Sequence, residues 1–452
     1  MRCELQAEFF QVAVVLAIQL FFVKFFIIMK KIFLGGVFVK KFFNWLIVIG
    51  FIISIANFAY AEQNYRLENV VIFSRHNVRS PTVSGSKILT QVTNHKWINW
   101  SGNAGELSTR GGLLETAMGE YFRKYLEKEN FLTANYVPAE NEFKFYANSR
   151  NRTMSTAKFF ASGLLPVADV KIEHKYPVET ANDEIFFTKM IDVDENFRAK
   201  ILDDIAKQNN VENFGELGKK FEPDVRLIEK IIDFKNSPYA KEKNISTLPT
   251  DDLNLVLEKN KTVKVSGGVE IAYNVSDGLL MQFYEEPLTY QKSFGRKISD
   301  KEFSQMMRFH RDCFAAVFGN PLSAPQICQP VLKFLSEEIS ADRKFTFICG
   351  HDSNILSMLT TLELENFSFP NSPENIPIGA KIVIEKRLGD DGKEYAKIYL
   401  LYQKFDQIKN LDVLSLENPP QTFDLKFKGL QENSDGLYLY SDFVNHLKSK
   451  IK

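Results

Sequence analysis

Two short apolar runs, far apart in the chain, each end at a cluster of polar residues, and this arrangement constrains the fold most strongly. Residues 69–74 read Asn-Val-Val-Ile-Phe-Ser, and residues 345–349 read Phe-Thr-Phe-Ile-Cys. Continuous β-branched and aromatic runs of this kind are typical of strands buried on both faces of a parallel sheet. Another strand signal at 143–147, followed by a helical spacing from Ser149, predicts that strands and helices alternate in an α/β fold.

The middle of the chain has a different pattern. From about residue 167 to 329 it consists of long charged amphipathic stretches with little strand character, such as 212–235 and 300–318. Strand signals then return, at 344–349, 380–387 and 395–402. We therefore predict a discontinuous α/β core made of residues 62–166 and 330–452, with residues 167–329 inserted as a mainly helical cap.

The first sixty residues predict a leader. Two apolar runs, 9–23 and 42–60, are both candidates to enter a membrane. The second run ends in Ala59-Tyr60-Ala61, the small-x-small pattern of a signal-peptidase site, so we expect residues 1–61 to be removed. Met29, followed by two lysines, is a plausible true start, and an uncleaved membrane anchor is the alternative interpretation.

The charges and the cysteines narrow the possible partners. The 56 Lys and Arg balance the 56 Asp and Glu, so no overall field favours nucleic acid or an anionic membrane, and any anion site must be local. No CxxC or paired-histidine spacing occurs, so we predict no metal site. Cys349 lies in an apolar run and is expected to be buried, which leaves Cys313 and Cys328 as the plausible partners for a disulfide.

The strongest motif is Arg-His-Asn-Val-Arg-Ser-Pro at residues 75–81, directly after the first strand. Open α/β sheets bind ligands at this edge, and guanidinium groups match phosphate oxygens bidentately. A surface turn with solvated arginines is the plain alternative. Because packing Arg75 and Arg79 around His76 has no obvious structural benefit, the motif predicts an anion site.

Two further segments have weaker signals. His351 and Asp352 follow the strand at 345–349 and precede a helix, where an aspartate alone is more often a helix cap. Arg152 falls in the first turn of another predicted helix, where its charge opposes the helix dipole unless an anion is bound nearby. An arginine there is usually solvated, so only the combination with the first motif favours one shared site.

Together these segments resemble the histidine acid phosphatase family, specifically its bacterial glucose-1-phosphatase branch. The resemblance runs from about Tyr65 to the C-terminus and includes residues 107–112, 146–149, 350–355 and 377–383. It implies a phosphoglycerate-mutase-like core, and with the leader it leads us to expect a periplasmic protein. At Asn77 much of the family has glycine; asparagine tolerates left-handed backbone angles, so the turn remains feasible.

The resemblance also implies roles for individual residues. His76 would be the nucleophile that forms a phosphohistidine, and Asp352 would be the proton donor. Phosphate binding falls on Arg75, Arg79, Arg152 and His351. The arginines would lower the pKa of His76 and stabilise the transferring phosphoryl group, so no metal or other cofactor is implied.

The expected partner is a small phosphorylated substrate, with glucose 1-phosphate favoured over the inositol phosphates of a phytase. A relative that binds phosphate without turnover and a phosphoglycerate-mutase-like phosphotransferase are rival interpretations. The sequence predicts no contact with a membrane except through the leader if that stays uncleaved, and it leaves the oligomeric state open.

Overall fold

The predicted strands belong to one sheet of mixed parallel and antiparallel strands. The computed structural model describes residues 63–286 and 297–452, so the predicted leader lies outside the described residues, and residues 65–452 form one unit. The strands of the main sheet are β1 (Tyr65–Arg75), β2 (Phe143–Ala147), β3 (Ile172–Glu173), β6 (Phe345–Gly350), β7 (Lys381–Gly389), β8 (Glu394–Tyr402), β9 (Gln421–Asp424) and β10 (Tyr438–Leu439). Their order is β10-β8-β7-β1-β6-β2-β3, and β9 pairs with β8.

The core strands of this sheet are parallel. β1 pairs with β6, β6 with β2 and β2 with β3, all in parallel register. On the other side, β7 runs antiparallel to β1 and forms a hairpin with β8, which also pairs antiparallel with β9 and β10. The predicted α/β fold with a parallel core is confirmed, and antiparallel strands extend it on one side.

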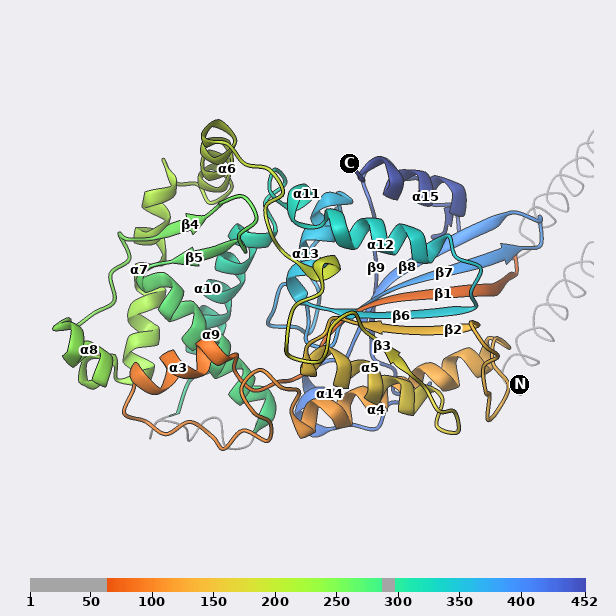
Figure 1. Ribbon diagram of the computed structural model, residues 1–452, viewed down its shortest axis with the longest axis horizontal. Coiled ribbons are helices and arrows are strands. Elements are labelled where there is room, and N and C mark those ends of the chain that lie inside the picture. Colours follow the sequence, from red (N-terminus) through yellow and green to blue (C-terminus); the bar gives the residue numbers. More distant parts are fainter. Residues whose placement is uncertain (1–62, 287–296) are drawn as a thin grey trace, which may run out of the picture. The chain divides into compact units, whose positions relative to one another are not determined.

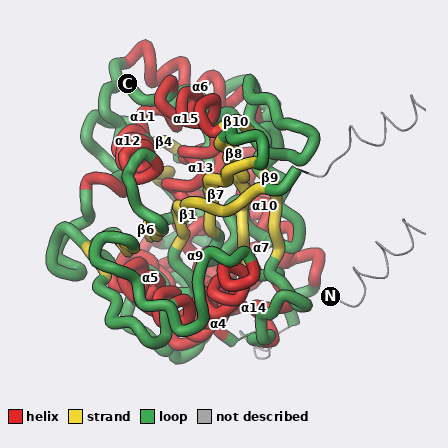
Figure 2. The backbone as a smooth tube through the Cα atoms, turned by 90° about the vertical axis from the view of Figure 1, so that its right-hand side faces the viewer, coloured by secondary structure: helices red, strands yellow, loops and turns green. Residues whose placement is uncertain are grey.

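Helices cover both faces of the sheet (Figures 1 and 2). One face packs against α4 (Thr109–Lys128) and α5 (Asn151–Leu164), and the other against α12 (Gln329–Ile339), α13 (Asp352–Thr361) and α15 (Tyr440–Ser449). Successive side chains of a strand point to opposite faces. Val70 and Ile72 of β1 therefore pack on the first layer, and Val71 and Phe73 on the second. All four are 0% exposed, which confirms a strand buried on both faces.

Most of the segment 167–329 is helical. It contains α6 (Glu195–Gln208), α7 (Phe214–Ile232), α8 (Pro238–Lys243), α9 (Gly268–Glu285), α10 (Asp300–Phe318), α11 (Ala324–Ile327), the short 3-10 helices η1 (Glu184–Phe186) and η2 (Phe234–Asn236), and the hairpin of β4 (Asn254–Val256) and β5 (Lys264–Ser266). The two amphipathic stretches coincide with α7 and α10.

Two helices from outside residues 167–329 also pack on the helical part. α3 (Val83–Gln91) packs against α9, and α14 (Phe405–Asn410) adds Phe405 and Ile408 to the same apolar cluster. Conversely, β3 lies within the predicted cap in sequence but belongs to the main sheet. The domain boundaries given above stay a prediction.

The predicted pairing of Cys313 and Cys328 is wrong, because both thiols are free and buried in different places. Cys313 lies on α10 in the apolar cluster of the helical part, whereas Cys328 belongs to the cluster on the second face of the sheet, with its Sγ 3.1 Å from Thr361 Oγ1. Cys349 is buried in β6, as predicted. Within the described residues, no helix has both the length and the apolar character needed to cross a membrane.

Candidate active site

The polar segments meet at the carboxyl ends of β1, β6 and β2. Arg75 lies opposite Gly350 in the parallel register of β1 and β6, so His76 and His351 leave adjacent strands at the same level. The peptide N–H of His76 donates to the carbonyl of Gly350 at 3.1 Å. The two imidazole centroids are 5.5 Å apart. The register of the parallel strands therefore brings together motifs that are far apart in the sequence.

Arg152 reaches the same edge from α5, which follows β2. Ala147 at the end of β2 pairs with Cys349 of β6, so α5 begins beside the segment that carries His351. Arg152 is half-buried, its Nε is buried without a partner, and it has no ion pair with any other described residue. Burial, followed by the charge of Arg79, lowers the pKa of Arg152 to about 10. It remains a cation at neutral pH and can bind an anion.

The orientation of His76 leaves one ring nitrogen free to react. Its Nδ1 lies 2.9 Å from the carbonyl oxygen of Asn77, which can only accept, so Nδ1 carries the proton and Nε2 keeps its lone pair. Burial, followed by the positive charge of Arg152, holds the pKa of His76 well below its usual range. The imidazole is therefore neutral and nucleophilic at Nε2 even in mild acid.

Asn148 fixes the proton of His351. The Asn148 Oδ1 accepts the peptide N–H of Asp183 at 3.0 Å, which turns the amide nitrogen toward His351. That nitrogen donates to His351 Nε2 at 2.7 Å, so His351 carries its own proton on Nδ1. Burial, followed by Arg152, holds the pKa of His351 well below its usual range. Our sequence analysis gave Asn148 no role. The one signal that could have found it is its position directly after a strand.

Two carboxylates hold Arg75 in place. Its guanidinium lies 2.9 Å from Asp352 Oδ2 and 2.7 Å from Glu374 Oε1, and it also donates to the carbonyl of Ile376. Glu374 accepts a second hydrogen bond, from the hydroxyl of Tyr284 at 2.8 Å. Sequence reasoning missed Glu374, because it lies in a loop without a recognisable pattern. The result is a buried guanidinium whose position does not depend on a ligand.

The surroundings of Asp352 favour its ionised form. Burial raises its pKa, but the charge of Arg75 and smaller contributions from His351 and Arg79 more than offset this, so the pKa lies below its usual value. Its Oδ1 accepts the peptide N–H of Ser353 at 2.8 Å, the helix-start contact considered in the sequence analysis.

Arg79 contacts a carboxylate from the helical part. Its two terminal nitrogens lie 3.1 to 3.3 Å from the oxygens of Asp277 on α9. This residue was also missed, because an acidic side chain on an amphipathic helix is ordinarily solvated. Asp277 therefore adds a negative charge beside a cation that was predicted to bind phosphate.

Comparison with known proteins identifies the family. A family model described as histidine phosphatase superfamily (branch 2) matches residues 66–207. A glucose-1-phosphatase of Providencia rettgeri is 30% identical over 387 residues, which cover 83% of this chain and 90% of that protein. The chain belongs to the histidine phosphatase superfamily. The resemblance inferred from the sequence motifs is thereby confirmed.

Other members of the superfamily have different substrates in their names. The phytase AppA of Escherichia coli (strain K12) is 26% identical over 408 residues, covering 86% of this chain and 92% of that protein. The structure of a phytase from Citrobacter braakii covers 86% of this chain and 98% of its own, with a TM-score of 0.75 and 24% identity. At that identity, the structural likeness supports the fold and not the substrate.

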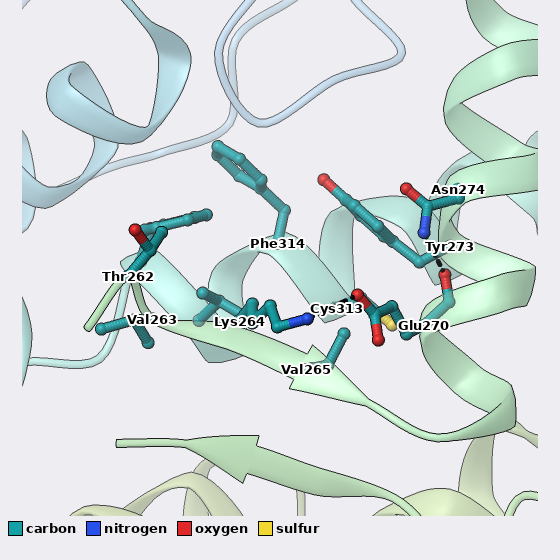
Figure 3. A pocket seen from close by; sticks show the side chains of 11 residues that line it. Thr262, Val263, Lys264, Val265, Glu270, Tyr273, Asn274, Cys313 and Phe314 are labelled. Carbon is teal, nitrogen blue, oxygen red and sulfur yellow. Dashed lines mark hydrogen bonds and ion pairs between the residues drawn. The ribbon is translucent and has the colours of Figure 1, made fainter. Parts of the chain in front are cut away.

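A separate cavity lies in the helical part, between β5, α9 and α10 (Figure 3). Its volume is about 240 Å³, and none of the six predicted site residues lines it. Tyr273 on its wall stacks on His310, with the ring centroids 4.8 Å apart. Among the residues that the structure describes, no three His, Cys, Asp or Glu side chains are grouped so that they could hold a metal ion.

Proposed function

We propose that this protein is a phosphomonoester hydrolase that transfers the phosphoryl group to His76. The observation that carries the proposal is that His76 keeps the lone pair on Nε2 while the charge of Arg152, which has no ion pair among the described residues, acts on the same imidazole. In the first step Nε2 attacks phosphorus, the bond to the substrate oxygen breaks, and Asp352 gives that oxygen a proton. Water then attacks the phosphohistidine, returns a proton to Asp352 and releases inorganic phosphate.

The remaining residues have supporting roles in this proposal. Arg75, Arg79 and Arg152 bind the nonbridging oxygens, whose charge they stabilise in the transition state. His351 donates from Nδ1, because Asn148 occupies its other nitrogen. Quenching a reaction with labelled substrate tests the proposal, since a base-stable, acid-labile phosphoenzyme should accumulate. Steady turnover with no such species would refute a phosphohistidine.

Glucose 1-phosphate is the substrate that we propose. The Asp277 carboxylate beside Arg79 repels further phosphate groups and can accept hydrogen bonds from sugar hydroxyls. A substrate with one phosphate and several hydroxyls therefore fits better than a polyanion. Relative kcat/KM for glucose 1-phosphate and phytate tests this choice, and Asp277→Asn should shift the ratio toward phytate. A ratio that already favours phytate would overturn it.

A phytase is the second candidate, supported by the 26% identity to the Escherichia coli enzyme. The same comparison of substrates decides between the two. A relative that binds phosphate without turnover is a further alternative, and activity on p-nitrophenyl phosphate would exclude it.

We also propose that the protein is exported to the periplasm and loses residues 1–61. The support is the Ala59-Tyr60-Ala61 pattern after an apolar run. N-terminal sequencing of the exported protein should begin at Glu62. A sequence beginning upstream of Ala61 would contradict cleavage at this site.

A further inference from the structure

Behind His76 lies a buried polar cluster that the proposed chemistry does not use. It consists of Asn77, Glu115 and Lys381, whose exposed fractions are 1%, 0% and 0%. Asn77 belongs to the turn after β1, Glu115 lies on α4, and Lys381 is the first residue of β7. Burying a carboxylate and an ammonium group is costly unless both are well paired. The meeting of three elements at this point therefore calls for a physical reason.

The contacts of the cluster fix the side chain of Asn77 at both ends. Its amide nitrogen donates to Glu115 Oε1 at 2.7 Å, and its Oδ1 accepts the peptide N–H of Val78 at 2.8 Å. Lys381 Nζ donates to the same Glu115 oxygen at 3.0 Å and to the carbonyl of Gly379 at 2.8 Å. A carboxylate only accepts and a peptide N–H only donates, so the amide of Asn77 has one possible orientation.

Glycines on two sides enclose the turn. Gly379 has a φ of +65°, and a Cβ on it would lie 2.5 Å from Asn77 Nδ2. A Cβ on Gly111 would lie 2.3 Å from the carbonyl oxygen of Val78. Asn77 is not among the residues with positive φ, so the turn forms without the left-handed backbone angles that asparagine tolerates. The turn depends on the Asn77 side chain and on close backbone contacts.

We propose that Asn77, Glu115 and Lys381 form a positioning network for His76, which rests on the nucleophile role proposed above. The link is the Asn77 carbonyl, which accepts the Nδ1 proton of His76 at 2.9 Å. If this peptide rotated, the imidazole could place its proton on Nε2 and would have no lone pair there to attack phosphorus. Anchoring Asn77 to Glu115 prevents that rotation, and Lys381 supplies the countercharge.

Asn77→Asp tests the network with little change of shape. It places a carboxylate against Glu115, and the repulsion between two carboxylates at this separation raises one pKa of the pair, so at low pH the pair holds one proton. The protonated pair restores the hydrogen bond. We expect the phosphorylation rate of the variant to equal that of the wild type at low pH. As the pH rises and the proton is lost, the rate should fall by about 10²-fold relative to wild type.

The ratio of the two rates is the quantity to measure, because the pH dependence of the wild type then cancels. A ratio of one over the whole pH range, in a folded variant, would overturn the network. So would a ratio that is low but independent of pH, since that result would indicate damage to the turn without the shared proton.

A second variant guards against loss of folding. The double substitution Glu115→Leu with Lys381→Met removes both charges together, so no buried charge is left alone. In ¹⁵N NMR spectra of the histidine rings, wild-type His76 should carry its proton on Nδ1, and the double variant should place part of it on Nε2. Its kcat should fall by about 10²-fold with little change of KM.

Glu385→Gln is the matched control. Glu385 is also 0% exposed, lies on the same strand β7, and accepts hydrogen bonds from Tyr125 and Tyr399 at 2.7 Å. This variant should lower the Tm without changing the His76 tautomer. An unchanged tautomer and kcat in the double variant would refute the network. Because NMR reads the tautomer directly, that test stands even if His76→Ala kept its phosphoenzyme and so refuted the nucleophile role.

Discussion

Asp352→Asn separates proton donation from positioning, because asparagine keeps the shape of the side chain and loses the acid. Its carbonyl oxygen can still accept the Ser353 N–H, which Asp352 binds at 2.8 Å. The amide nitrogen then takes the place of Asp352 Oδ2, which pairs with Arg75 at 2.9 Å, and because both groups only donate, this contact is lost. Arg75 nevertheless keeps Glu374 at 2.7 Å and the carbonyl of Ile376. The guanidinium should therefore stay in place, and the loss of activity should report the missing proton.

The size of the effect depends on the leaving group. A sugar alkoxide needs a proton as it departs, and a positioned general acid contributes about 10²- to 10⁴-fold. That range corresponds to about 2.7 to 5.4 kcal/mol of transition-state stabilisation. p-Nitrophenolate is a stable anion that scarcely needs a proton, so phosphorylation by p-nitrophenyl phosphate should slow much less, by about tenfold at most.

Rapid-quench bursts with both substrates measure the phosphorylation step apart from the later attack by water. The expected result is a large loss of burst rate with glucose 1-phosphate and a small loss with p-nitrophenyl phosphate. If both substrates lost burst rate equally, Asp352 would hold the site together as a helix cap or as a partner of His351. The proton donor would then have to be another residue.

Four further outcomes are expected. His76→Ala should form no acid-labile phosphoenzyme in quench labelling, and retained label would place the nucleophile elsewhere. Arg152→Gln should lower kcat/KM by about 10²- to 10³-fold. The control Arg150→Gln should lower it much less, because the guanidinium of Arg150 is already paired with Glu179 at 3.0 Å. Equal losses would contradict a special role for Arg152. A chelator should leave activity unchanged, and a loss restored by divalent metal would count against the arginine site. Binding of inorganic phosphate should take up a proton, so the affinity for phosphate should fall as pH rises. Calorimetry in buffers of different ionisation enthalpy measures this uptake, and a result of no uptake would contradict the prediction.

The parts of the site that follow from local pattern could be predicted. β1 and β6 are continuous apolar runs, and parallel strands that end at one edge must bring their following residues together. This places His76 beside His351 without knowledge of the helices. The sequence analysis singled out Arg152 because a cation in the first turn of a helix opposes the helix dipole unless an anion is bound nearby.

The remaining contacts depend on partners that no local pattern marks. Asn148 orients His351 only because the peptide N–H of Asp183 occupies its oxygen. Asp277 reaches Arg79 only because α9 lies over the strand ends. Likewise, setting Cys349 aside as buried left Cys313 and Cys328 as a pair but said nothing about whether they lie in the same apolar cluster. Sequence reasoning therefore found the ionic groups that meet at this edge of the sheet and missed those that orient and balance them.

The balance of charge has a consequence for the chemistry. Arg75 pairs with Asp352 and Glu374, and Arg79 pairs with Asp277, while Arg152 has no such partner among the described residues. Three guanidinium groups thus face three carboxylates, and both histidines have pKa values that keep them neutral. A phosphate dianion would bring two uncompensated negative charges unless a proton arrived with it.

Asp352 is the carboxylate best placed to take that proton. Its side chain is 26% exposed, whereas that of Glu374 is 4% exposed and is bound by both Arg75 and Tyr284. The arginine that holds the pKa of Asp352 low would share its charge with a bound phosphate, so this pKa has to rise on binding. A low pKa in the unliganded protein is therefore compatible with an acid role. The negative charge of the substrate would itself create the proton donor that its leaving oxygen needs.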